Sequence, residues 1–146
     1  MRALGSILVL VALVALALVA APFASADDGG RPFNLTLTGD AERPGPGDPD
    51  GTGTAHLRLN PGQGEVCYEY SVSDVAPLTA AHIHRAPVTD PGPVVIPTPK
   101  TSDTGGVGCV SADRELILEI IRNPAGFYFN VHNADFPAGA LRAQLG

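Results

Sequence analysis

Residues 54–72 read TAHLRLNPGQGEVCYEYSV, and this stretch decides the fold class. Apolar residues fill every second position on both sides of the Pro-Gly-Gln-Gly segment at 61–64. The first set is Ala55, Leu57 and Leu59, and the second is Val66, Tyr68, Tyr70 and Val72. Alternation with a period of two is typical of a strand that buries one face, and proline with glycine is typical of a turn. The stretch therefore predicts a β-hairpin, with Cys67 on the face opposite the tyrosines.

Similar short strand segments recur along the rest of the chain. They cover 33–38, 80–85, 94–96, 127–132 and 140–145, with Pro- and Gly-rich loops at 43–51, 87–93 and 100–108. One helix is predicted from Arg114 to Arg122, where apolar residues recur at helical spacing after Asp113 as N-cap. Together these segments predict an all-β fold, a Greek-key-like antiparallel β-sandwich or barrel with one short helix, in one domain over 33–146.

Composition narrows the class of partner. The chain has 146 residues, with 14 prolines, 17 glycines and a formal net charge of −6. So many helix breakers argue against a helical bundle. The acidic balance repels phosphate groups, which argues against nucleic acid or an anionic membrane surface as partner.

The N-terminus has the layout of a secretory signal peptide over residues 1–26. Arg2 supplies the positive start, Ile7 to Ala21 is an unbroken apolar run, and Ala24-Ser25-Ala26 is a small-x-small cleavage site. The alternative is a retained membrane anchor, but the run is shorter than the roughly 20 residues that span a bilayer. We therefore expect cleavage after Ala26, a flexible leader over 27–32, and a secreted protein with no stable membrane insertion.

The two cysteines, Cys67 and Cys109, both follow the predicted cleavage site. Two cysteines in an exported domain most simply form one disulfide, whereas two free buried thiols would suit a reducing compartment. Their wide spacing is unlike the short Cys-x-x-Cys spacing of redox pairs, so the sequence predicts a structural bridge.

Five short motifs then occur in a characteristic order. They are AHIH at 81–84, GPVV at 92–95, NVH at 130–132, FPAG at 136–139 and LRAQL at 141–145. In this arrangement the chain resembles exported bacterial members of the CHRD (chordin-like) domain family. The family often has Glu and Gly where this chain has Ala140 and Ala143. The resemblance implies an extracellular β-sandwich domain with a cysteine pair placed like Cys67 and Cys109, and it implies no reaction.

Three histidines form the candidate site. His82 and His84 are two residues apart on a predicted strand, so both point to one face. His132 shares a face with Tyr128 and Asn130 on another strand. If the two strands are neighbours, the three imidazoles suit zinc or copper. The alternative is a structural role, in which the imidazoles hydrogen-bond to the backbone or to each other.

Polar side chains that would complete such a structural network are Asn130, Arg142 and Gln144. The His-x-His spacing also resembles that of copper–zinc superoxide dismutases, by analogy of fold and spacing only. The fourth histidine, His56, is predicted to be an ordinary surface residue.

Three classes of function remain open. The first, which the resemblance favours, is a non-catalytic extracellular module that binds a protein or cell-surface component and needs no cofactor. The second is a metal-binding protein that uses His82, His84 and His132 to hold copper or zinc. The third is a hydrolase with an unrecognised site. The sequence has no Gly-x-Ser-x-Gly motif and no phosphate-cradling Gly-Lys-Ser/Thr motif, so no catalytic residues are assigned.

Overall fold

The computed structural model describes residues 29–146. The predicted signal peptide with its cleavage point after Ala26, and the first two residues of the predicted leader, lie outside the described residues. The first strand, β1 (Arg31–Thr38), begins at Arg31 rather than at Phe33. Within residues 29–146, no helix is long and apolar enough to cross a lipid bilayer.

The hairpin predicted over 54–72 is confirmed. Strands β2 (Thr52–Asn60) and β3 (Glu65–Ser73) pair antiparallel along their whole length. Gly64 closes the turn with a φ of 65°, a conformation that glycine adopts without steric cost. The alternating apolar side chains of both strands face the core, with exposures of 6 % or less.

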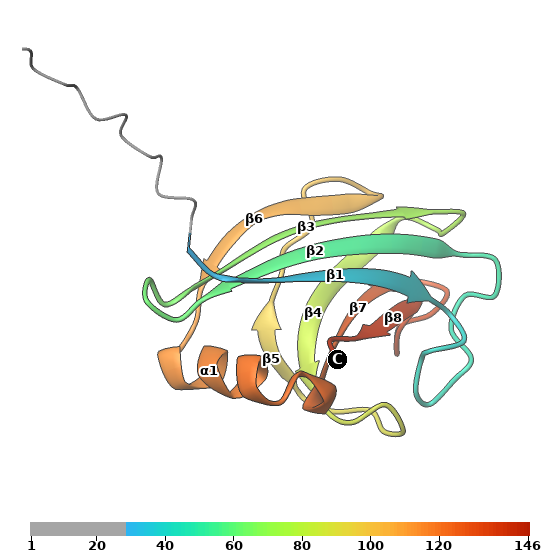
Figure 1. Cartoon of the computed structure of the whole chain (residues 1–146). Helices are drawn as coiled ribbons and strands as arrows, with labels where there is room; N and C mark the ends of the chain where they lie inside the picture. Colours follow the sequence, from blue (N-terminus) through green and yellow to red (C-terminus); the bar gives the residue numbers. More distant parts are fainter. Residues whose placement is uncertain (1–28) are drawn as a thin grey trace, which may run out of the picture.

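In the described part of the chain, eight antiparallel strands form one sheet in the order β5-β4-β7-β8-β1-β2-β3-β6. The remaining strands are β4 (Leu78–Arg85), β5 (Val94–Pro97), β6 (Gly105–Ser111), β7 (Phe127–Asn133) and β8 (Leu141–Gln144). The sheet bends into two facing layers, β1-β2-β3-β6 and β5-β4-β7-β8 (Figure 1). The layers join where Thr38 of β1 pairs with Arg142 of β8. The predicted all-β fold with one helix is confirmed.

At the opposite side of the barrel from the β1–β8 junction, hydrogen bonds from two tyrosine hydroxyls connect the layers. Tyr68 donates a hydrogen bond to the carbonyl of Pro99, and Tyr70 donates to the carbonyl of Thr98, both at 3.1 Å. These bonds tie β3 to the chain after β5, so the barrel is nearly closed although its two edge strands share no ladder.

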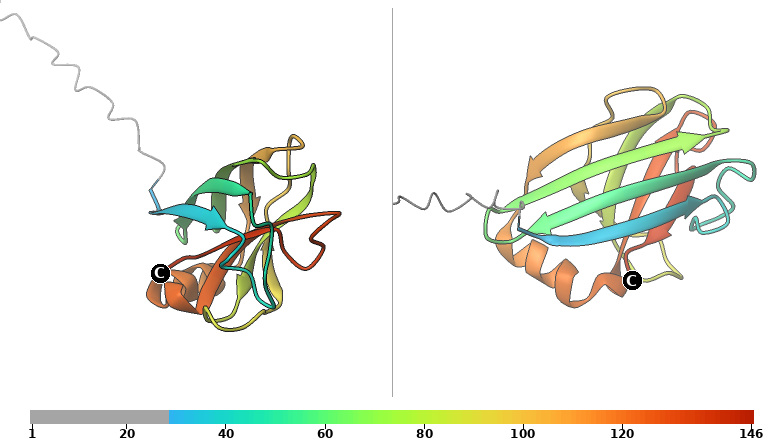
Figure 2. Two further views of the ribbon diagram at one scale, coloured as in Figure 1. Left: turned by 90° about the vertical axis from the view of Figure 1, so that its right-hand side faces the viewer. Right: turned by 45° about the horizontal axis from the view of Figure 1, so that its top comes forward.

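The helix α1 (Arg114–Arg122) has the predicted bounds and covers one end of the barrel (Figure 2). The Asp113 side chain accepts hydrogen bonds from the backbone N–H groups of Glu115 and Leu116, which satisfies two free donors of the first turn. Ile117 and Ile120 are fully buried against the core. A short 3-10 turn, η1 (Pro124–Gly126), then leads into β7.

The loop predicted at 100–108 is partly wrong, because β6 begins at Gly105. Gly106 and Gly108 pair with Tyr70 and Tyr68 of β3. A Cβ atom added at Gly106 would lie 2.7 Å from the Tyr70 hydroxyl, and one at Gly108 would lie 3.1 Å from the Tyr68 hydroxyl. These two strand positions are therefore glycine because the tyrosine rings occupy the space that a side chain would need.

Cys67 of β3 and Cys109 of β6 are directly paired positions and form the predicted disulfide, so the alternative of two free thiols is wrong. The bond closes a sequence separation of 42 residues and ties the edge strand to the sheet.

Candidate metal centre

The antiparallel pairing of β4 with β7 brings the sequence-predicted histidines together. His82 lies opposite Asn130, His84 opposite Tyr128, and His132 opposite Ala80. The intervening residues, Ile83, Phe129 and Val131, are fully buried in the core. Because side chains alternate along a strand, the imidazoles stand on the outer face of the β4–β7 pair. We call His82, His84 and His132 the histidine cluster.

The three rings are in mutual contact range. Their centroids are 5.5 Å apart for His82 and His84, 5.2 Å for His82 and His132, and 6.0 Å for His84 and His132. One nitrogen of each ring lies within 4.8 Å of the corresponding nitrogen of the other two. Three potential nitrogen ligands therefore converge on one place.

Hydrogen bonds to the backbone orient two of the rings. Nδ1 of His84 donates to the carbonyl of Gly92 at 2.8 Å, and Nδ1 of His132 donates to the carbonyl of Pro137 at 3.1 Å. A carbonyl oxygen only accepts, so in each ring Nδ1 carries the hydrogen and Nε2 is left with a lone pair. A backbone carbonyl on the distal nitrogen is the usual partner of a metal-binding histidine.

Each ring of the cluster has one nitrogen without a hydrogen-bond partner. Nε2 of His84, Nε2 of His132 and Nδ1 of His82 are buried and make no hydrogen bond. Buried polar atoms in proteins are nearly always satisfied, so each such atom calls for an explanation. Three of these atoms belong to the histidine cluster.

The electrostatic environment keeps the cluster neutral. Burial lowers the pKa of all three imidazoles. Repulsion from neighbouring histidines lowers it further at His82 and His132, whereas at His84 the added lowering comes from Arg142 and is opposed by hydrogen bonds to Gly92 and Asn130. For His82 the pKa falls to about 4, from burial first and then from His132 and His84. Metal binding requires neutral imidazole, and at neutral pH these lone pairs meet little competition from protons.

A stacked group of side chains supports the cluster from one side. The ring of His84 lies against that of Tyr128, with centroids 4.7 Å apart and planes inclined by 9°. The guanidinium carbon of Arg142 lies 3.5 Å from the centroid of the same tyrosine ring. The Tyr128 hydroxyl accepts a hydrogen bond from the N–H of Gly92, whose carbonyl holds His84. The loop after β4 is therefore fixed against this face.

Arg142 and Gln144 of the predicted polar network bind this loop rather than the imidazoles. Arg142 donates to the carbonyls of Pro87 and Asp90 at 2.9 and 3.0 Å. Gln144 donates to the carbonyl of Ala86 at 2.9 Å. Both side chains thus position the segment that carries the hydrogen-bond acceptor of His84.

Asn130 makes a contact that the sequence did not predict. Its Nδ2 donates to Oε1 of Glu42 at 3.3 Å, and both side chains are almost fully buried. Burial raises the pKa of Glu42 to about 7, against the opposing effects of Asn130, Arg142 and Arg43. Glu42 belongs to the Pro- and Gly-rich connection between β1 and β2, and no local pattern marks a glutamate there as buried.

With this geometry established, comparison with known families identifies the domain. The family model for the CHRD domain matches residues 33–145. The chain belongs to the CHRD domain family. A search of curated proteins and a search of solved structures each found no match. The matched range of the CHRD domain contains every residue of the histidine cluster and its supporting side chains.

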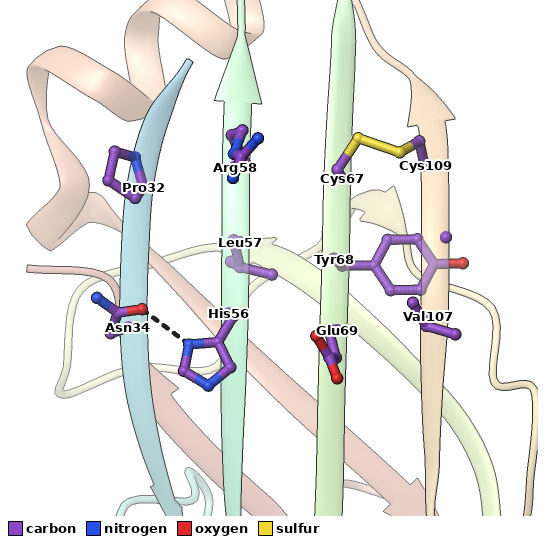
Figure 3. A pocket seen from close by; sticks show the side chains of 11 residues that line it. Pro32, Asn34, His56, Leu57, Arg58, Cys67, Tyr68, Glu69, Val107 and Cys109 are labelled. Carbon is purple, nitrogen blue, oxygen red and sulfur yellow. Dashed lines mark hydrogen bonds between the residues drawn. A yellow bond between two sulfur atoms is a disulfide. The ribbon is translucent and has the colours of Figure 1, made fainter. Parts of the chain in front are cut away.

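The opposite layer of the CHRD domain carries a hollow of about 500 Å³ (Figure 3). Its lining includes Asn34, His56, Glu69 and the disulfide. His56 pairs through Nδ1 with Oδ1 of Asn34 at 2.8 Å, so it is separate from the histidine cluster and has a partner. Within residues 29–146, none of the buried polar atoms without a partner belongs to this lining.

One further group of potential ligands combines Glu65 with Cys67 and Cys109. The two sulfur atoms are joined in the disulfide and offer no thiolate to a metal ion. In the described part of the chain, the histidine cluster is therefore the stronger candidate site.

Proposed function

We propose that the mature chain is a non-catalytic extracellular CHRD-domain binding module, and that its histidine cluster binds one copper or zinc ion. The observation that carries the proposal is that the three rings place one nitrogen each within 4.8 Å of the others, while each ring also has a buried nitrogen without a hydrogen-bond partner. The CHRD family, the disulfide and the predicted signal peptide support a location outside the cell.

A purely structural role explains the cluster less well. Leaving one buried polar atom unsatisfied costs about 1–3 kcal/mol, and here three such atoms lie together. In a structural network these nitrogens would accept hydrogen bonds from donors. The opposite nitrogens, Nδ1 of His84 and Nδ1 of His132, do have such partners, because they donate to backbone carbonyls. A metal ion satisfies all three lone pairs at once.

The chemistry of the donors selects the class of metal. Neutral imidazole nitrogen suits zinc and copper, whereas calcium and magnesium prefer oxygen. Nitrogen atoms bound to one ion at about 2 Å are at most about 4 Å apart. One nitrogen of each ring already lies within 4.8 Å of the others, so binding requires only small ring movements. His82 and His132 are partly exposed, which gives an ion access to the cluster.

The test is metal binding by purified mature protein that has first been stripped with a chelator. We expect one zinc or copper ion per chain by mass spectrometry and by titration calorimetry. The substitutions H82A and H132A are expected to weaken metal binding about 100-fold or more. Loss of a residue that only hydrogen-bonds to a metal ligand already weakens binding about 10- to 100-fold, and loss of the ligand itself should cost more. The matched control is H56A, which removes a histidine from the other layer and should leave the affinity unchanged.

Circular dichroism of each variant shows whether the fold is intact. Substoichiometric metal in the wild-type protein, or equal weakening in H56A and H82A, contradicts the metal proposal. The binding-module proposal also expects an extracellular protein or cell-surface component as partner. Cross-linking of the wild-type protein and of H82A to intact producing cells, compared side by side, tests whether such a partner depends on the cluster.

A further inference from the structure

Asn130 occupies the middle of the face that carries the histidine cluster. In the ladder it lies opposite His82 on one side and opposite Arg142 on the other. It also lies two residues before His132 on the same strand, so both side chains share the outer face. Asn130 has only 1 % of its surface exposed.

The two ends of the Asn130 amide have different surroundings. Nδ2 is engaged by the Glu42 carboxyl, whereas Oδ1 is buried and has no hydrogen-bond partner. The amide also makes a hydrogen-bonding contact with the His84 ring that raises the pKa of His84, but no contact of Oδ1 has the geometry of a well-formed hydrogen bond. Oδ1 therefore belongs to the same face as the histidine cluster, and like one nitrogen of each ring it is a buried acceptor without a well-formed hydrogen bond.

Lone pairs on the three ring nitrogens and on Oδ1 of Asn130 can be satisfied by a cation or by a hydrogen-bond donor. A cation bound by the three ring nitrogens satisfies their lone pairs. An uncharged amide oxygen, however, is a weak ligand for zinc or copper compared with imidazole, so Oδ1 needs a hydrogen-bond donor. Three protein ligands leave a fourth tetrahedral position, which is normally filled by water. A metal-bound water carries hydrogens and would satisfy the remaining acceptor.

We propose that the metal centre, on whose existence this inference rests, keeps one coordination position open to water or a small anion, and that Oδ1 of Asn130 accepts a hydrogen bond from the water held there. Glu42 acts as a positioning residue, because its hydrogen bond to Nδ2 fixes which end of the amide faces the cluster. The competing arrangement is a rotated amide whose Nδ2 donates to His84, which would make Asn130 a structural partner only.

Cobalt(II) is the probe, because its visible absorption reports a change of ligand, and azide is the small anion. Wild-type protein with one cobalt ion is expected to change its spectrum when azide is added. In N130D the new carboxylate is placed where it can take the fourth position. We expect this variant to bind cobalt about 10-fold more tightly or better, and to lose the azide response.

The matched control is N34D, the same chemical change at an exposed position of the opposite layer, which should keep wild-type affinity and azide response. The double variant N130D/E42Q retains a hydrogen bond between the two positions with donor and acceptor exchanged, so it tests the same point if N130D folds poorly. An azide response in N130D equal to that of the wild-type protein overturns the inference, as does a cobalt-loaded wild-type protein that ignores azide. In both cases stoichiometric cobalt binding would leave the proposed function standing, whereas absence of cobalt, zinc and copper binding would refute both.

Discussion

The buried carboxyl of Glu42 should make the stability of the metal-free protein depend on pH in a defined direction. Burial raises its pKa from 4.5 to about 7, so between these values the folded chain holds a proton that the unfolded chain has released. The stabilisation is fully present below pH 4.5 and is lost as the pH rises through 7. A tenfold change in proton affinity corresponds to about 1.4 kcal/mol, so the whole loss amounts to about 3 kcal/mol.

The histidine cluster acts in the opposite direction and must be separated from this effect. Its lowered pKa values mean that the unfolded chain binds protons that the folded chain does not, so stability from this source is lost as the pH falls from 6.5. The wild-type profile alone is therefore a sum of two opposing trends. Comparison with E42Q isolates the carboxyl, because the substitution leaves the histidines in place and keeps an acceptor for Asn130.

The assay is urea unfolding of wild-type protein and E42Q in the presence of a chelator, from pH 4.5 to 8. We expect E42Q to gain about 3 kcal/mol relative to the wild-type protein across this range. The matched control is E69Q, which makes the same chemical change at an exposed position on β3. If the difference between E42Q and the wild-type protein varies by less than about 0.5 kcal/mol, the scatter of ordinary surface substitutions, the reasoning about the buried carboxyl is refuted.

Three further predictions concern the barrel itself. Because the disulfide closes a separation of 42 residues, the double variant C67S/C109S should lose about 4 kcal/mol of unfolding free energy. A Cβ atom at Gly139 would overlap the buried Glu42 carboxyl, so G139A should cost about 1–3 kcal/mol. Removing the hydroxyl in Y70F leaves the Thr98 carbonyl without its donor and should cost about 1–3 kcal/mol.

Urea unfolding at one pH measures all three effects. G62A is the control for G139A, since the turn at Gly62 has more room for a methyl group. Wild-type stability in C67S/C109S would contradict the expectation that the disulfide stabilises the fold by shortening the free loop of the unfolded chain. Equal effects of G62A and G139A would contradict the close packing around Glu42. Unchanged stability of Y70F would show that the closure between β3 and the chain after β5 does not depend on the Tyr70 hydroxyl.

Local pattern was sufficient for much of the fold. Alternation over 54–72 predicted the hairpin, and helical spacing after Asp113 predicted α1 with its observed bounds. The His-x-His spacing placed His82 and His84 on one face, because alternation of side chains is a property of the strand alone. With only two cysteines in the chain, the disulfide pairing was also readable from the sequence.

Tertiary structure decided the features that depend on which segments meet. Strand β6 was hidden because glycines show no alternation, and only the overlying rings of Tyr68 and Tyr70 explain them. The sequence offered His132 as a third ligand, but the pairing of β4 with β7 brings it to the cluster. Glu42 was missed altogether, since its burial arises where distant segments meet. Side-chain direction is fixed by the local backbone, whereas convergence, burial and loss of hydrogen-bond partners depend on contacts between distant parts of the chain.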